Sequence, residues 1–312
     1  MDKANFETIE AIKGNVEKVF YGKADAIRMV LVGLVSGGHV LLEDVPGVGK
    51  TLFAKALARS IDCAFQRVQF TPDLLPTDVV GVSIYDSRSG EFVYRPGPIF
   101  ANIVLADEIN RTTPRTQSCL LQAMNDREVT VDRITHPLPL PFIVMATQNP
   151  HEFEGTYPLP ESELDRFLLQ LRIGYPPEDD EKRILRDNIS TDSADALTPV
   201  ATTEDVQRLQ KAVVGVAVSD DILDYQMEII FRTRETEELE FGASPRASLA
   251  LYRAAQAMAM TEMRDYCVPD DVKRLVRPVL EHRLLSRGGA EGPDGGPGEV
   301  LEEILGSVKP PL

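Results

Sequence analysis

The stretch between residues 39 and 51 constrains the fold of this chain more than any other. It reads HVLLEDVPGVGKT, an apolar strand followed by a Gly-rich turn, a Lys-Thr pair and a helical pattern. Such a turn directs backbone N–H groups and the N-terminus of the next helix at phosphate groups. Lys50 is then expected to reach the β- and γ-phosphates of ATP, and Thr51 to hold Mg²⁺. The other positions expected to contact the nucleotide are Pro46, Gly47, Val48, Gly49 and Leu52.

Asp44 stands where this phosphate-binding motif asks for glycine. Aspartate tolerates unusual backbone conformations better than most residues, so the turn can form if the carboxylate points away from the phosphates. The alternative is a Gly-rich turn that only connects a strand to a helix. The order of strand, turn and helix favours phosphate binding.

Composition restricts the partners that the chain can have. A net charge of −16 is expected to repel nucleic acid unless an assembly gathers basic residues on one face. Three cysteines without CxxC spacing favour a reducing cytoplasm, and four scattered histidines do not suggest a metal cluster. No apolar stretch approaches the length that crosses a bilayer. We therefore expect a cytoplasmic protein without nucleic acid partners or direct membrane insertion.

Short apolar runs separated by helical patterns predict an α/β fold with a parallel sheet that helices cover on both faces. The expected strands are 40–42, 65–70, 103–106, 142–146 and 168–173. The pattern before the first strand, over residues 4–36, is helical. These elements predict a first domain over residues 1–175.

The pattern changes after residue 174, where a GYPP turn closes the last expected strand. Residues 176–287 predict an all-helical domain, with helices at 203–213, 220–235, 244–263 and 269–285. Residues 288–312 are predicted to be a flexible tail, since they begin with a stretch rich in Gly, Pro and acidic residues. A short helix at 299–305 within this tail either docks back or stays mobile.

Two further strands end in polar residues that suit ATP hydrolysis. Residues 103–108 read IVLADE, where Asp107 is suited to hold Mg²⁺ through water and Glu108 to act as general base. Residues 142–150 read FIVMATQNP, where Asn149 can hydrogen-bond the γ-phosphate or the attacking water. Alternatively, the two acids are only solvent-exposed residues at the end of a strand, and Asn-Pro only starts a turn. Parallel strands bind ligands at their C-terminal edge, and three polar endings there favour the functional interpretation.

Four motifs together resemble the MoxR family of AAA+ ATPases, in the helix-2-insert clade, over nearly the whole chain. They are ADEINRTTP at 106–114, ATQNP at 146–150, EGTYPLPE at 154–161 and LDRF at 164–167. The resemblance implies an AAA+ P-loop domain followed by a small helical lid. It also implies that Asn149 is sensor 1, that Arg166 is an arginine finger for the neighbouring subunit, and that Arg246 is sensor 2. Alternatively, Arg166 pairs with Asp165 or Glu163 in its own subunit, and Arg111 or Arg115 acts at the interface between subunits. The alternative for Arg246 is an arginine at a helix start that is only exposed to solvent.

The resemblance further implies ATP hydrolysis in a homo-oligomeric ring, expected to be a hexamer, with a chaperone-like role. Such a protein would mature or activate a client enzyme, by inserting a metal or cofactor, together with a partner that carries a von Willebrand factor A domain. Two predicted hairpins, at 81–94 and 128–141, resemble inserts that contact substrate, or they only brace their neighbours. Other interpretations are an ATP-dependent binding switch with little turnover, a helicase-like motor on DNA, and a magnesium-chelatase-type subunit.

Overall fold

The computed structural model describes residues 2–149, 155–287 and 296–311. A five-stranded parallel sheet with strand order β2-β5-β8-β1-β9 forms the centre of the first domain. Its strands are β1 (Val40–Glu43), β2 (Phe65–Gln69), β5 (Ile103–Asp107), β8 (Ile143–Gln148) and β9 (Leu169–Leu171). The predicted α/β class and all five predicted strands are thereby confirmed.

Alternate residues of the central strands enter two separate hydrophobic cores, because side chains of a strand point to opposite faces. Val40 and Leu42 belong to one core, whereas Leu41 lies in the other. The first core includes residues of α1 (Lys3–Val16), α2 (Ala24–Ser36), α3 (Lys50–Ser60) and α8 (Thr203–Ala212), and it continues into the C-terminal helices. Helices α4 (Pro76–Val80) and α5 (Pro114–Asp126) cover the opposite face. Burial on both faces explains why β1, β5 and β8 read as continuous apolar runs.

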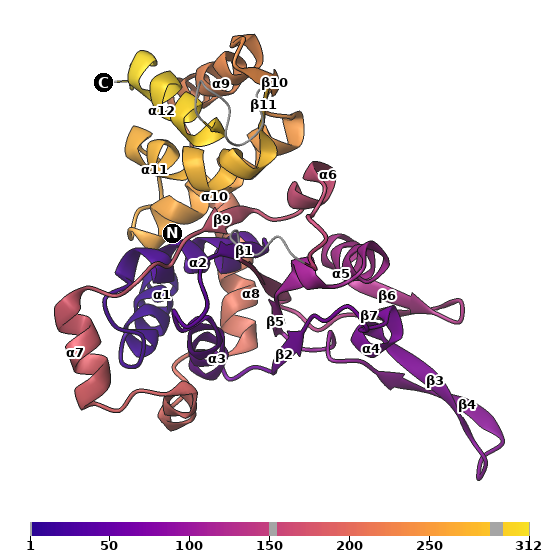
Figure 1. The fold of residues 1–312 in the computed structure, drawn as a ribbon. Coiled ribbons are helices and arrows are strands. Elements are labelled where there is room, and N and C mark those ends of the chain that lie inside the picture. Colours follow the sequence, from indigo (N-terminus) through magenta and orange to yellow (C-terminus); the bar gives the residue numbers. More distant parts are fainter. Residues whose placement is uncertain (1, 150–154, 288–295, 312) are drawn as a thin grey trace.

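Helix α8 follows the predicted domain boundary at residue 175 but packs against α1 and α2 of the sheet domain. Helix α7 (Glu178–Arg186) lies at the outer side of α1 (Figure 1). Short elements connect the larger ones. They are α6 (Glu161–Leu164), η1 (Ile109–Arg111), η2 (Thr191–Ala196), η3 (Val213–Gly215) and η4 (Glu281–Arg283).

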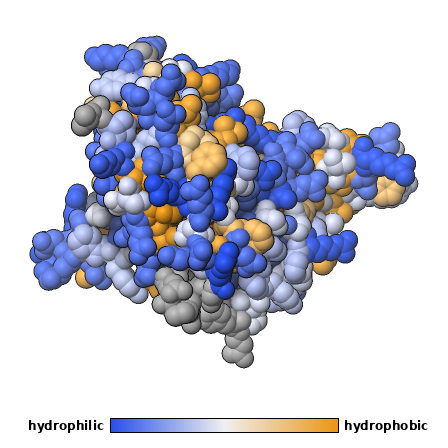
Figure 2. All heavy atoms as spheres, turned by 90° about the horizontal axis from the view of Figure 1, so that it is seen from above, coloured by the Kyte–Doolittle hydropathy of each residue, from blue (hydrophilic) through white to orange (hydrophobic). Residues whose placement is uncertain are grey.

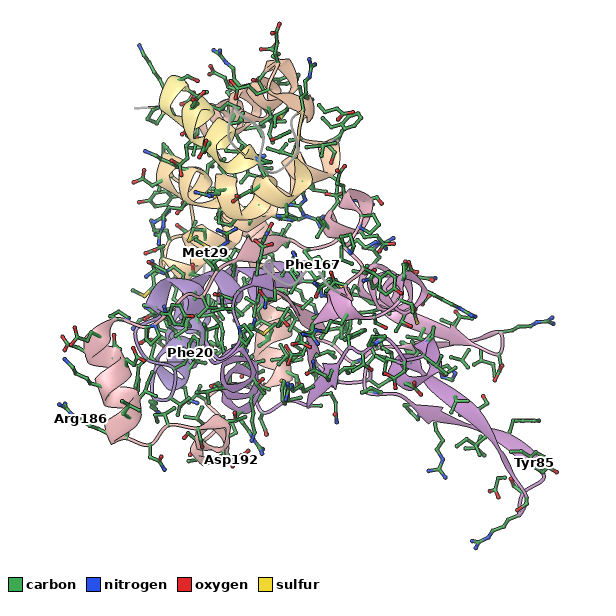
Figure 3. All side chains as sticks on the ribbon, viewed as in Figure 1. Phe20, Met29, Tyr85, Phe167, Arg186 and Asp192 are labelled. Carbon is green, nitrogen blue, oxygen red and sulfur yellow. The ribbon has the colours of Figure 1, made fainter. Side chains whose placement is uncertain are left out.

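Two antiparallel hairpins leave the sheet domain in the same direction (Figure 1). They consist of β3 (Gly81–Asp86) with β4 (Glu91–Pro96), and of β6 (Glu128–Val131) with β7 (Ile134–Pro137), where the sequence predicted them. Tyr94 and His136 join the hairpins by ring stacking, with centroids 4.1 Å apart. Tyr85 lies near the far end of the longer hairpin (Figure 3), and Phe92 is paired opposite to it. Hydrophobic residues interrupt the hydrophilic surface along this projection (Figure 2).

The C-terminal lid is a group of helices that lies above the sheet domain in Figure 1. Its helices are α9 (Asp220–Glu235), α10 (Pro245–Thr261), α11 (Pro269–Leu280) and α12 (Pro297–Ser307). The prediction of an all-helical domain misses a small antiparallel sheet of β10 (Leu239–Phe241) and β11 (Leu285–Ser286). Among the described residues, no helix combines the length and apolar character needed to span a bilayer.

The last helix, α12, docks back onto the lid, which decides between the two possibilities left open by the sequence. Leu301 is fully buried, and Arg277 of α11 lies 3.0 Å from Glu302. The predicted tail therefore contains an ordered element from residue 297 onward. The Gly- and Pro-rich stretch at 288–295, which was predicted to be a flexible link, lies outside the described residues.

Candidate nucleotide site

The Gly-rich turn connects β1 to α3 at the C-terminal edge of the sheet. Gly47 and Gly49 both have φ of +89°, a conformation that glycine adopts without strain. Helix α3 begins at Lys50 directly after the turn, so the N–H groups of its first turn face the same space. A Cβ atom on Gly47 would meet no heavy atom within 4 Å, so this part of the turn is open. The Nζ atom of Lys50 donates to the carbonyl oxygen of Asp44 at 2.9 Å.

Asp44 has a structural role that explains why it replaces glycine. Its carboxylate accepts hydrogen bonds from the backbone N–H groups of Ile173 and Gly174, the latter at 3.0 Å, just beyond the end of β9. The carboxylate is thus engaged away from the Gly-rich turn, as the sequence analysis required. Asp44 thereby ties the start of the phosphate-binding loop to the last strand of the sheet.

Two adjoining cavities lie over this edge of the sheet. The first has a volume of about 350 Å³ and is lined by the turn and by the polar strand ends. Its lining contains the predicted residues Pro46, Gly47, Gly49, Lys50, Thr51, Leu52, Asp107, Glu108 and Asn149. The second has a volume of about 400 Å³ and shares Gly47, Gly49, Leu52 and Thr191 with the first.

The second cavity has largely apolar walls. They come from Val48, from Val19, Phe20 and Tyr21 between α1 and α2, and from Ile184 and Leu185 of α7. The Phe20 ring is fixed by stacking on Phe53 of α3, with centroids 4.6 Å apart. A ligand with a charged end and a flat apolar end matches these joined cavities. A larger cavity of about 620 Å³, which shares Phe20, Tyr21 and Lys23 with the second, is lined by none of the predicted nucleotide residues.

Asp107 ends β5 with both carboxylate oxygens engaged. Its Oδ1 accepts from Thr147 Oγ1 at 2.7 Å, and its Oδ2 accepts from Nε and Nη2 of Arg67 at 3.0 and 2.6 Å. Thr147 also accepts from the backbone N–H of Glu108 at 2.8 Å, so one hydroxyl orients both acids.

Glu108 has φ of +57°, a left-handed conformation that is uncommon for residues other than glycine. Such backbone strain is often found at functional sites. The Glu108 carboxylate accepts from Gln69 Nε2 at 2.6 Å and lies 3.2 Å from Nε of Arg111. It therefore lies in the first cavity, where a general base for water is needed.

Several residues that line this cavity were not among the predicted site residues, namely Arg67, Gln69, Thr147, Gln148 and Thr191. Arg67 and Gln69 occupy alternate positions of β2, and Gln69 is paired in register with Asp107. Their spacing places them on one face of the strand, which was the available signal. Arg67 and Gln69 reach this site only because β2 pairs with β5, and no local sequence motif predicts that pairing.

The donor set at this edge fits Mg²⁺. Thr51 supplies a hydroxyl and Asp107 a carboxylate, both hard oxygen ligands, and both line the first cavity. The guanidinium of Arg67 lies against Asp107, so this carboxylate already interacts with a positively charged group. The described part of the chain contains no cluster of three or more His, Cys, Asp or Glu side chains that could hold a metal by itself.

Arg166 and Arg246 do not line either nucleotide cavity. The N–H of Leu168 donates to the carbonyl oxygen of His39, just before β1, so residue 166 lies at the N-terminal edge of the parallel sheet. Arg166 donates to the carbonyl oxygen of Leu121 at 3.1 Å and lies 3.6 Å from Glu163. In this structure Arg166 therefore contacts one of the two acids that the sequence analysis left open as its own-subunit partner.

Arg246, at the start of α10, has a side chain that is 62% exposed and pairs with Asp165 at 3.2 Å. Arg283 of η4 pairs with the same carboxylate at 2.8 Å, but its side chain is only 4% exposed. Arg283 and His282 both donate to the carbonyl oxygen of Phe167, at 2.6 and 3.0 Å. Burial lowers the pKa of His282 to about 3, so it stays neutral. This cluster fastens the lid to the segment that carries Arg166, and Phe167 lies between lid and sheet in Figure 3.

Known proteins share both parts of this architecture. The profile of the ATPase family associated with various cellular activities (AAA) matches residues 39–169, and that of the AAA lid domain matches residues 231–304. YeaC of Bacillus subtilis, described as uncharacterized, is 50% identical across 96% of this chain and 93% of its own length. Chaperone MoxR1 of Mycobacterium tuberculosis is 42% identical across 99% of this chain and 84% of its own length. A crystal structure of a candidate ATPase from Cytophaga hutchinsonii has a TM-score of 0.90 at 37% identity, covering 99% of this chain and 96% of that chain.

Proposed function

Because this chain belongs to the MoxR family of AAA+ ATPases, we propose that it hydrolyses Mg²⁺-bound ATP at the edge of the sheet where its phosphate-binding turn and acids meet. The observation that carries this proposal is the single cavity lined by Lys50, Thr51, Asp107, Glu108 and Asn149. Phosphoryl transfer depends mainly on positioning and on neutralising charge, and these side chains can supply both.

Each residue has a role that follows from its chemistry. Lys50 and the N–H groups of the turn bind the β- and γ-phosphates, while Thr51 and Asp107 hold Mg²⁺, which neutralises phosphate charge when bound. Glu108 accepts a proton from the attacking water, and Asn149 donates to that water or to the γ-phosphate. The adjoining apolar cavity beside Phe20 receives the base of the nucleotide.

The proposed working form is a ring, with a hexamer as the expected size. Supporting this, neither Arg166 nor Arg246 lines the nucleotide cavity of its own chain. An arginine supplied by a neighbour would stabilise the charge that develops during phosphoryl transfer, so Arg166 is proposed as the finger and Arg246 as sensor 2. Arg111 and Arg115 remain the rival candidates, and Arg111 lies beside Glu108.

The first test is the steady-state ATPase rate per subunit as a function of protein concentration, with light scattering in parallel. A specific rate that rises as large particles form supports a site shared between subunits. Glu108→Gln should bind ATP without turnover, and Arg166→Ala should do the same. Mixing the two variants should restore activity in part, because some interfaces then combine an intact Glu108 with an intact Arg166.

The rival interpretation of an ATP-dependent binding switch predicts a different result. Its rate would stay low at all concentrations, and Glu108→Gln would change little. If stable mixed rings show no rescue, the assignment of Arg166 to the neighbouring site is wrong, although ATP hydrolysis itself can stand.

We further propose a chaperone-like role in the cytoplasm, in which ATP turnover matures or activates a client enzyme by metal or cofactor insertion. A relative that is named a chaperone supports this role. The long hairpin, with Tyr85 56% and Phe92 74% exposed, is the proposed contact with the client. Recovery of a partner with a von Willebrand factor A domain by ATP-bound Glu108→Gln would support the role. Strong, salt-sensitive DNA binding would instead favour a DNA motor.

A further inference from the structure

Arg67 is an additional cation in the phosphate cavity, and the sequence motifs assign no role to it. It lies on β2, next to the strand that carries Asp107, and its side chain lines the first cavity together with Lys50. Two of its nitrogens donate to Oδ2 of Asp107, while Thr147 occupies Oδ1. Asp107 therefore has no oxygen that is not already engaged.

This arrangement conflicts with metal binding at Asp107. A guanidinium on Oδ2 of Asp107 would repel Mg²⁺ at short range, so the ion and its water shell would bind this carboxylate more weakly while Arg67 is paired with it. Thr147 is fixed within the sheet, because it also accepts from the N–H of Glu108 and is almost fully buried. Arg67 is the partner that can leave, since its side chain is 48% exposed in the middle of the edge strand β2.

We propose that Arg67 is a positioning residue that holds Oδ2 of Asp107 in the nucleotide-free protein and is displaced when Mg²⁺ arrives with the nucleotide. The inference rests on the proposed function, because it takes Asp107 as the metal ligand. Arg67 thereby sets the metal affinity of the site, since each binding event must first break its pair with Asp107.

The same arginine links the metal position to the general base. Its Nη2 also donates to Oε1 of Gln69 at 2.9 Å, and Nε2 of Gln69 donates to Glu108. Arg67 thus holds Asp107 directly and Glu108 through Gln69. Glu108 also keeps its pair with Arg111, 3.2 Å away, so Arg67 acts on Glu108 only indirectly, and its direct effect is on Asp107.

The test measures the affinity of Mn²⁺, by electron paramagnetic resonance, for the full chain saturated with a non-hydrolysable ATP analogue. Arg67→Ala should bind Mn²⁺ about two- to five-fold more tightly, the change expected when one partly exposed ion pair no longer has to be broken. Arg67→Lys should fall between Arg67→Ala and the wild type, because it keeps the charge without the two-pronged contact. Arg172→Ala is the matched control, since Arg172 pairs with Glu43 at 3.1 Å at the same sheet edge but outside the phosphate cavity.

Asp107→Asn separates failure of this inference from failure of the proposed metal site. If Asp107→Asn weakens Mn²⁺ binding and Arg67→Ala strengthens it, the inference stands. If Asp107→Asn weakens binding while Arg67→Ala leaves it unchanged or weaker, Arg67 does not compete with the metal, and only the inference fails. If Asp107→Asn binds Mn²⁺ as the wild type does, Asp107 is not the metal ligand and the inference fails with that assignment.

Discussion

The lid cluster allows a sharp prediction because two arginines share the carboxylate of Asp165 in opposite environments. The side chain of Arg283 is 4% exposed and that of Arg246 is 62% exposed. Arg283 also donates to the carbonyl oxygens of Phe167 and Val279. We predict that Arg283→Ala strongly destabilises the protein, whereas Arg246→Ala hardly changes its stability.

The magnitudes follow from burial. Removing one partner of a buried ion pair costs about 3–5 kcal/mol, because the remaining charge and carbonyl groups lose their donor. Losing an exposed pair costs about 0–1 kcal/mol, since water replaces the contact. The unfolding entropy of a 312-residue chain is about 0.65 kcal/mol/K, at about 2.1 cal/mol/K per residue. Arg283→Ala should therefore lower Tm by about 5–8 °C, and Arg246→Ala by less than about 2 °C.

Differential scanning calorimetry of both variants at pH 7.5 measures this difference, with circular dichroism to confirm that both are folded. If the lid unfolds as a separate unit, its transition should shift further, because fewer residues share the entropy change. Equal changes in Tm for the two variants, or a change below 2 °C for Arg283→Ala, would show that burial does not determine how much each ion pair contributes to stability.

Two further predictions concern the sheet domain. Burial lowers the pKa of His39 to about 4, and its neutral ring accepts from Val144 N–H and donates to the carbonyl oxygen of Met124. In the unfolded chain, His39 takes up a proton near pH 6.5. The neutral buried ring therefore contributes fully to the unfolding free energy above that pH, and this contribution falls by up to about 1.4 kcal/mol per pH unit between pH 6.5 and 4. Urea titrations at pH 7, 6 and 5 should show a shallower pH slope for His39→Gln, and an unchanged slope would contradict the buried neutral ring. Asp44→Ala should cost about 1–3 kcal/mol and weaken binding of a fluorescent ATP analogue, since its bonds to residues 173 and 174 hold the loop; unchanged affinity would mean that the loop does not need this tie.

Features encoded in consecutive residues could be predicted from the sequence. The Gly-rich turn, the buried strands and the two hairpins each have a local signature, because strand periodicity, glycine conformation and turn chemistry act over a few residues. The gathering of Lys50, Asp107, Glu108 and Asn149 in one cavity also follows, since parallel strands end at the same edge. The resemblance added Arg166 and Arg246, whose spacing alone indicates nothing.

Features that depend on contacts between distant segments could not be predicted. Asp44 looked like a defect in a motif, because its partners lie about 130 residues later, at the end of β9. Arg67 and Gln69 looked like ordinary polar positions of a strand until β2 was paired with β5. The small sheet of β10 and β11 joins segments on either side of two helices, and neither strand is long enough to show an alternating pattern.

The direction of the sheet limits which nucleotide the lid-side arginines can reach. His39 directly precedes β1 and is level with the start of β9. Asp44 directly follows β1 and begins the phosphate-binding loop, so the two residues are five positions apart. At about 3.3 Å per residue they lie about 16 Å apart, and Arg166 lies beyond the His39 end. Because the packed helices keep the sheet rigid, the distance between its two edges does not change. Neither Arg166 nor Arg246 can therefore reach the phosphates of its own chain by a side-chain rotation. A neighbouring subunit can present its phosphates to that edge without distorting the sheet. Because Asp165, adjacent to Arg166, is paired with two arginines of the lid, a shift of the lid would change how Arg166 is presented. The stability of this cluster would then affect how precisely Arg166 is placed in the proposed shared site.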